Sequence, residues 1–150
     1  MLYEKKRTFG LGPIDLATAA FAMVGQTGAS ANIYAGDLAV NATPATAGAL
    51  DYEEANQHFP EENTLEIYGW ETAASSGGAS TLTVILQSSA DGDSWKDEFT
   101  LSFLEDDIVK DALMYRSTIP AHAKRYMRLV LVVGTEAMTA GQILAMVRPL

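Results

Sequence analysis

Residues 81–103 carry the pattern that most restricts the fold of this chain. Apolar residues alternate with polar or β-branched ones in residues 81–87, and the alternation resumes in residues 99–103. A period of two over such runs is typical of half-buried antiparallel strands. The dipeptide Asp91-Gly92 between them favours a chain reversal, because it tolerates positive φ angles. The stretch therefore predicts a β-hairpin with a connection of roughly ten residues.

Further strand patterns lie on both sides of this hairpin. Alternation predicts strands at residues 65–70, 112–119, 125–133 and 142–148. Residues 1–50 are rich in Ala, Gly and Thr and contain only short apolar runs, which favours short strands and an extended arm over residues 1–30. About eight short strands with Gly, Pro and Asp turns indicate an all-β fold, an antiparallel β-sandwich forming one domain over the whole chain. A jelly roll is the favoured topology, although strand order does not follow from spacing.

The two C-terminal strand segments are apolar on both faces. In residues 125–133 the second face comprises Tyr126, Arg128, Val130 and Val132, and in residues 142–148 it comprises Leu144 and Met146. An antiparallel sheet commonly has one solvated face, so this pattern implies that something covers the outward side.

Composition narrows the classes of function. The chain has 19 acidic and 10 basic residues and a net charge of −9, which opposes affinity for nucleic acid or anionic lipid. It has no cysteine and only two histidines, His58 and His122, so disulfides and thiolate metal sites are excluded and zinc binding is disfavoured. We expect no cofactor and no bound metal.

The acidic segments do not form a recognisable metal or catalytic motif. Residues 91–97 superficially resemble a calcium loop, but Trp95 and Lys96 stand where an oxygen ligand and a glycine are required. Residues 51–62 and 105–107 are acidic without a spacing that fixes calcium geometry. Neither a GxSxG motif nor a phosphate-binding loop is present. We expect no enzymatic activity.

The N-terminus imitates a targeting signal without its composition. A basic run at residues 5–7 precedes an apolar stretch that Pro13 and Asp15 interrupt, which argues against a signal peptide. Residues 16–36 are uncharged but consist mostly of Ala, Gly, Thr and Ser, too weakly apolar for a membrane span. We expect a soluble product, made in the cytoplasm, with no membrane partner.

Four segments follow one another in a recognisable order. They are GASANIYAGD at residues 28–37, LTVILQSSADGDSW at 82–95, KRYMRLVLVVG at 124–134 and TAGQILAMV at 139–147. Together they resemble the cement, or decoration, proteins of tailed bacteriophage capsids that have a jelly-roll fold. The resemblance covers the chain from residue 28 to the end, apart from residues 51–62.

This resemblance implies a structural virion protein that binds the outer surface of a shell and clamps neighbouring major capsid proteins without doing chemistry. Such proteins act as homodimers or homotrimers. The second faces of the C-terminal strands are then a candidate interface, made of Tyr126, Arg128, Val130, Val132, Leu144 and Met146. The basic run Lys5, Lys6 and Arg7 is a further candidate, which either docks on an acidic shell surface or forms a solvated chain end.

An alternative from a different class stays open, namely a carbohydrate-binding β-sandwich of discoidin type, for example on a virion surface. The segment LQSSADGDSW also resembles a turn of such modules. Trp95, Trp70 and the Asp-Gly loop would supply ring and polar contacts to a sugar. A third hypothesis, an enzyme that uses the acidic loops as a metal site, has less support.

Overall fold

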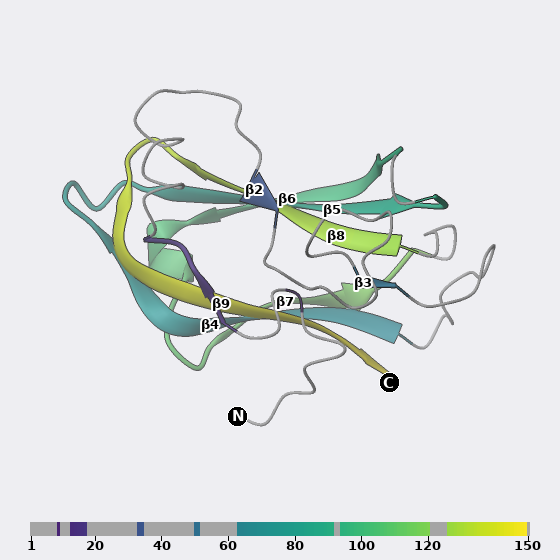
Figure 1. Cartoon of the computed structure of the whole chain (residues 1–150). Coiled ribbons are helices and arrows are strands. Elements are labelled where there is room, and N and C mark those ends of the chain that lie inside the picture. Colours follow the sequence, from purple (N-terminus) through teal and green to yellow (C-terminus); the bar gives the residue numbers. More distant parts are fainter. Residues whose placement is uncertain are drawn as a thin grey trace.

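The described part of the chain is built almost entirely of β-strands (Figure 1). The structure, a computed structural model, describes residues 9, 13–17, 33–34, 50–51, 63–91, 94–120 and 126–149. The elements are β1 (Ile14–Asp15), β2 (Ile33–Tyr34), β3 (Leu50–Asp51), β4 (Asn63–Ser75), β5 (Thr81–Ser89), β6 (Lys96–Leu104), the 3-10 turn η3 (Glu105–Asp107), β7 (Leu113–Thr118), β8 (Tyr126–Gly134) and β9 (Met138–Pro149). Within these ranges, no helix has the length and apolar character needed to cross a bilayer.

The strands form two antiparallel sheets that pack face to face, as the sequence predicts. One sheet has the order β1-β9-β4-β7, and the other has the order β2-β8-β5-β6 with β3 also paired to β8. Because β2 and β3 pair with successive parts of β8, they occupy one position at the edge of their sheet. Numbered with these two as one strand, the sheets read 1-8-3-6 and 2-7-4-5. This is the strand order of a jelly roll, so the expected topology is confirmed.

The hairpin predicted from residues 81–103 is present as β5 and β6. The two strands pair from Thr81 opposite Leu104 to Ser88 opposite Lys96, with a β-bulge between Leu86 and Gln87. The connection is therefore confined to residues 90–95 and is shorter than the expected one of roughly ten residues. The difference arises because polar residues at the end of each strand continue the ladder, which hydropathy alone does not reveal.

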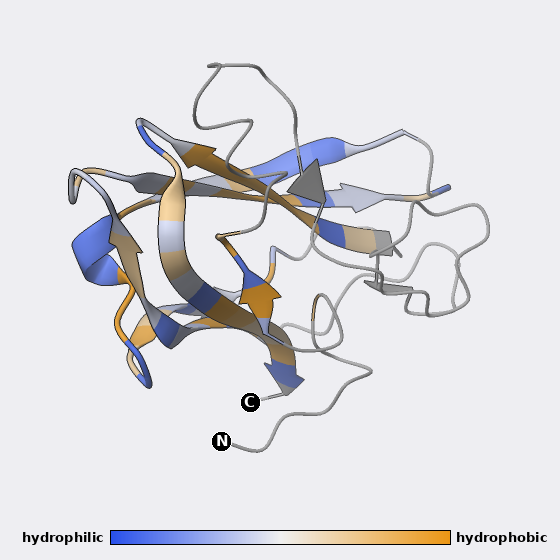
Figure 2. Cartoon of the chain, turned by 60° about the vertical axis from the view of Figure 1, so that its left-hand side comes forward, coloured by the Kyte–Doolittle hydropathy of each residue, from blue (hydrophilic) through white to orange (hydrophobic). Residues whose placement is uncertain are grey.

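The hydrophobic core lies between the two sheets. In β5, buried and half-buried residues alternate, so that Leu82, Val84 and Leu86 point into the core. Figure 2 shows apolar residues on strands of both sheets. The largest fully buried side chains are Phe9, Leu16, Leu65, Ile67, Leu82, Leu86, Ile108, Met127, Leu129, Leu131 and Ile143.

Strand β4 is longer than the pattern at residues 65–70 predicts. It continues to Ser75, opposite Met138 of β9, through several register shifts. Residues 71–75, beyond the predicted segment, therefore also belong to the strand. A Cβ at Gly141, where φ is 135°, would lie 3.0 Å from the Cα of Ala73, so only glycine lets the strands approach this closely.

The described part of the predicted N-terminal arm packs on the sheet of its own chain. Ile14 lies opposite Ile143 of β9, and the amide of Leu16 donates a hydrogen bond of 2.9 Å to the carbonyl of Gly141. Phe9 and Leu16 are fully buried. The rest of residues 1–30 lies outside the described ranges.

Leu131→Ala should lower the free energy of unfolding by about 2–5 kcal/mol, because truncating a buried leucine leaves a cavity in the core. Leu131 is fully buried in β8, whereas Leu104 is 64% exposed at the end of β6. The matched variant Leu104→Ala should change the unfolding free energy by less than about 0.5 kcal/mol. Urea denaturation of both variants measures the difference, and equal losses would contradict this placement of the core.

Candidate functional site

Three residues of the predicted interface on β8 and β9 are buried within the single chain. Val130 and Leu144 are fully buried and Met146 is 3% exposed, while Val132 is half-buried. Val130, Leu144 and Met146 do not belong to the core cluster between the sheets, so they lie on the outward sides of their strands. A contact between copies at these residues stays a prediction. It would require whatever covers them within the chain to move aside.

The other predicted interface residues have different positions. Lys5, Lys6 and Arg7 lie outside the described residues. Tyr126 begins β8 and pairs with Asp51 and Ser89, but its side chain also lies outside the described part of the structure.

Arg128, the remaining predicted residue, belongs to a polar row across the second sheet. Its guanidinium lies 4.1 Å from the centroid of the Trp95 ring, and its Nε donates a hydrogen bond of 2.7 Å to Oε1 of Gln87. Gln87 in turn donates to Asp97 at 2.6 Å. This row joins β8, β5 and β6. The face of Trp95 that Arg128 covers is therefore not available for stacking on a sugar.

A second polar network lies on the outward side of the first sheet. The buried carboxylate of Glu66 in β4 accepts hydrogen bonds from Nε of Arg116 in β7 at 2.8 Å and from Nη1 of Arg148 in β9 at 3.4 Å. It also accepts a bond of 2.9 Å from the hydroxyl of Tyr68. Tyr68 and Glu66 raise the pKa of Arg116. The network satisfies a buried charge and joins three neighbouring strands.

Two carboxylates tie together the three connections at one end of the sandwich. The connections β4–β5, β6–β7 and β8–β9 all cross between the sheets there. Oγ of Ser75, at the end of β4, lies within hydrogen-bond distance of Oε2 of Glu105 and at 2.6 Å from Oε1 of Glu136. The amide of Ser75 also donates to Glu105 at 3.1 Å. Ser75 stands at the start of the β4–β5 crossing and therefore contacts one residue from each of the other two crossings.

The carboxylate of Glu136 is held by the backbone of the β4–β5 connection. The amides of Gly77 and Ala79 donate to Oε1 at 3.0 and 2.8 Å. A Cβ at Gly77 would come within 2.7 Å of Oε2, so the carboxylate fits against a residue without a side chain. The Ser75 hydroxyl, followed by the amides of Ala79 and Gly77, lowers the pKa of Glu136.

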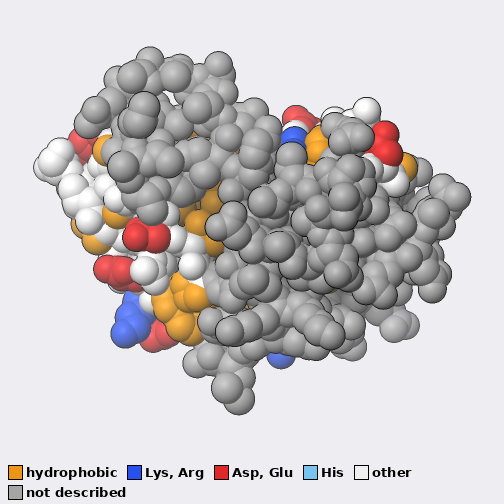
Figure 3. All heavy atoms as spheres, in the orientation of Figure 1, with side chains coloured by type: hydrophobic (Ala, Val, Ile, Leu, Met, Phe, Trp, Pro, Cys, Tyr) orange, Lys and Arg blue, Asp and Glu red, His pale blue; other side chains and the backbone are white. Residues whose placement is uncertain are grey.

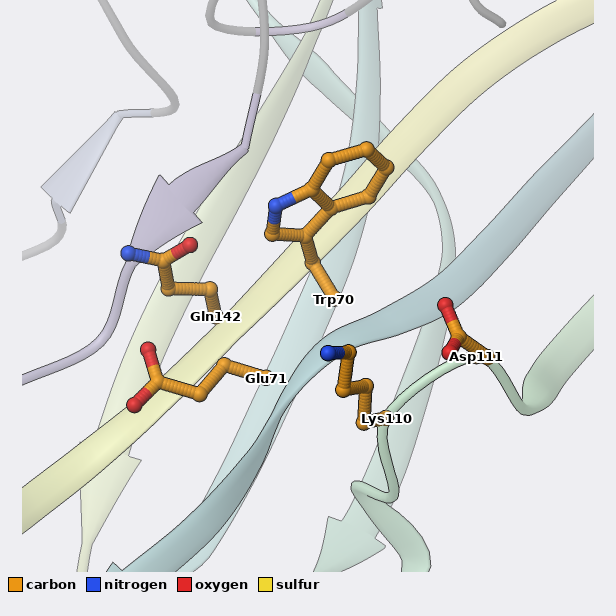
Figure 4. A pocket seen from close by; sticks show the side chains of 5 residues that line it. All are labelled: Trp70, Glu71, Lys110, Asp111 and Gln142. Carbon is orange, nitrogen blue, oxygen red and sulfur yellow. The ribbon is translucent and has the colours of Figure 1, made fainter. Parts of the chain in front are cut away.

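An open hollow of about 510 Å³ lies beside the C-terminal half of β4 (Figure 4). Figure 4 shows the indole of Trp70 above the ammonium of Lys110, with the carboxylates of Glu71 and Asp111 on either side of Lys110 in this view. Trp70 and Glu71 come from β4, Gln142 comes from β9, and Lys110 and Asp111 come from the connection that leads to β7. The hollow therefore combines an aromatic ring with both signs of charge and an amide.

The backbone that carries the hollow is fixed by close packing. The amide of Gly69 donates to the carbonyl of Ala112 at 2.9 Å, and the amide of Asp111 donates to the carbonyl of Gly69 at 2.8 Å. A Cβ at Gly69 would lie 2.0 Å from the carbonyl oxygen of Val109, which excludes any side chain there. Asp111 has a φ of 63°, a left-handed conformation that Asp tolerates better than most residues.

No group of three or more His, Asp or Glu side chains within the described ranges is arranged to hold a metal ion. Asp91, in the segment that resembles a calcium loop, accepts hydrogen bonds from the amide of Ser94 at 2.9 Å and the hydroxyl of Ser89 at 2.8 Å. It therefore closes a local turn. His58, His122 and residues 52–62 lie outside the described ranges.

The sequence patterns predict neither the hollow nor the cluster of Ser75, Glu105 and Glu136. Ser75 is 30 residues from Glu105 and 61 residues from Glu136, so the cluster exists only through the strand order. A usable signal is the run of small residues at 75–80, whose backbone amides need acceptors once the connection is ordered.

The fold and these surface clusters define a jelly-roll protein whose described part carries outward-facing polar networks and a hollow of mixed charge. The sequence matches the family model described as Bbp16 over residues 34–147. The chain therefore belongs to the Bbp16 family. No curated protein matches it.

Glu136→Gln should lower the melting temperature at neutral pH. Because the pKa of Glu136 is lowered in the folded chain, the ionised carboxylate stabilises the fold above its unfolded pKa of about 4.3, and this contribution is lost as pH falls through the lower folded pKa. The difference in melting temperature between the wild type and the variant should therefore narrow below about pH 4. Circular dichroism melts at a series of pH values measure it.

Glu71→Gln is the matched control for this experiment, because Glu71 is exposed and lies outside the Ser75 cluster. It should show no comparable difference from the wild type at neutral pH. A constant difference between Glu136→Gln and the wild type at every pH would contradict the assigned role of the carboxylate.

Proposed function

We propose that this protein is a capsid cement protein, which binds the outer surface of a bacteriophage shell and clamps neighbouring major capsid proteins. The observation that carries the proposal is the jelly-roll strand order in a chain whose ordered segments resemble such proteins. Membership in the Bbp16 family over residues 34–147 fits a phage protein.

The physical properties of the domain suit a structural role. Its long central strands, β4 and β9, pair over most of their lengths, and carboxylates tie the crossings at one end. A net charge of −9 favours solubility of an abundant protein and complements a basic partner surface. These features support a rigid binding module that does no chemistry.

The proposal includes the partners and the location of the protein. It binds the major capsid protein and a second or third copy of itself, is made in the host cytoplasm and ends on the outside of the virion. Nucleic acid and membranes are not its partners. The copies meet through symmetric contacts, for which the outward sides of β8 and β9 and the basic run at residues 5–7 are the proposed surfaces.

A carbohydrate-binding role is the second candidate, and the indole and carboxylates of the hollow are the observation in its favour. The arrangement of the two tryptophans weakens it. Trp70 belongs to β4 of one sheet and Trp95 precedes β6 of the other, and Arg128 covers one face of Trp95. The two rings therefore do not form one platform for a sugar.

Co-sedimentation with expanded empty shells of the cognate phage tests the proposal. The protein at about 10 µM should pellet with the shells and saturate at a fixed ratio to the major capsid protein. An unrelated acidic β-sandwich protein is the control for nonspecific trapping. A wild-type protein that stays in the supernatant at this concentration would sink the proposal, and binding to a glycan array in its place would favour the second candidate.

A further inference from the structure

The large hydrophobic side chains that are exposed among the described residues gather at the crossing from β6 to β7. They are Leu104, Val109 and Leu113, with exposed fractions of 64%, 45% and 45%. Val109 directly precedes Lys110 of the hollow, and Leu113 follows two residues after Asp111. Figure 3 shows hydrophobic side chains beside acidic and basic ones among the described residues on one side of the molecule. Two exposed apolar residues therefore lie within two positions of Lys110 and Asp111 along the chain, and exposed apolar side chains are typical of protein interfaces.

The charge inside the hollow is unbalanced. Glu71 and Asp111 contribute two carboxylates, whereas Lys110 contributes one ammonium group. Within the described ranges, neither carboxylate forms an ion pair. The hollow is therefore open to one additional positive charge, and the overall charge of −9 favours the approach of a cationic group.

We propose that this hollow is a socket for an arginine side chain of a partner protein. A guanidinium can lie against the indole of Trp70 while its N–H groups donate to the carboxylates of Glu71 and Asp111. Val109 and Leu113 contact apolar groups next to that arginine. Arginine and tryptophan are among the residues that contribute most to protein interfaces. That the arginine belongs to the major capsid protein rests on the proposed function, whereas the socket itself does not.

The socket is already formed before a partner arrives. Gly69 holds the connection at residues 108–112 against β4, and Asp111 is fixed in its left-handed conformation by the bond from its amide to Gly69. The amide of Lys110 donates to Oγ1 of Thr72 at 3.0 Å. A pre-organised backbone reduces the entropy lost on binding.

Lys110 allows a test in which two kinds of substitution change the affinity in opposite directions, because its ammonium group repels a cationic occupant that the carboxylates attract. Removal of the ammonium in Lys110→Gln should tighten binding, and Glu71→Gln with Asp111→Asn should weaken it. Asparagine accepts the left-handed conformation at residue 111, so the latter pair preserves the backbone. An uncharged sugar would not respond with these opposite signs.

The experiment titrates the full-length, 15N-labelled protein with the peptide N-acetyl-Gly-Arg-Gly-amide and follows the indole N–H signal of Trp70, assigned with Trp70→Phe. The signal should shift to saturation, with a dissociation constant on the order of 1 mM. Binding should weaken about fivefold in the variant with Glu71→Gln and Asp111→Asn, and strengthen about twofold in Lys110→Gln. The same peptide with Gln in place of Arg is the matched control, and melting temperatures verify folding.

Three results would overturn the socket: no shift of the Trp70 signal, the same affinity in the carboxylate variant, or a shift with N-acetylglucosamine but none with the arginine peptide. Shell co-sedimentation decides the natural partner separately. If the wild type and the carboxylate variant pellet equally, the shell does not use this socket and the proposed function stands. If the wild type does not pellet, the proposed function fails, and the titration still decides whether the hollow binds arginine.

Discussion

The sandwich depends on the two carboxylates that meet at Ser75. Burying or confining a carboxylate is unfavourable without donors, and a connection rich in small residues leaves backbone amides that need acceptors. In the β4–β5 connection, the amide of Ser80 donates to Glu105 and the amides of Gly77 and Ala79 donate to Glu136, so the carboxylates satisfy the amides and the amides satisfy the carboxylates. The carboxylates and the backbone amides therefore stabilise one another. Because the partners come from three different crossings, the same contacts fix how the two sheets are joined at that end.

The surface features follow from this fixed framework. The connection that begins with Glu105 runs back along β4, where the missing side chain of Gly69 lets the backbone of Val109 approach closely. This places Lys110 and Asp111 beside Trp70 and Glu71, which are distant from them in sequence. The polar rows around Glu66 and Arg128 likewise join neighbouring strands on the outward sides. Charged side chains therefore contribute to the architecture and to the proposed contact surface.

The sequence was informative where one strand alone carries the signal. The alternation of Leu82, Val84 and Leu86 is sufficient to predict β5, and the jelly roll follows from the number of such strands together with the resemblance. Prediction from the sequence failed where the position of a residue depends on a contact with a residue far away in the chain. The close approach of β4 to β9 at Ala73 requires Gly141, and the double-sided apolar pattern predicted that Leu144 is covered but not which part of the molecule covers it. The hollow could not be predicted, because its side chains come from three segments.

The pairing of β4 with β9 has a mechanical consequence. It extends from Asn63 opposite Pro149 to Ser75 opposite Met138, so the longest ladder among the described strands runs through the middle of its sheet. A pull along these strands loads their cross-strand hydrogen bonds together, whereas a pull across them would separate the bonds one after another. The domain is thus stiffest along one axis. A protein of this kind that is stretched between two attachment points would therefore resist the force longest if both points pulled along this axis.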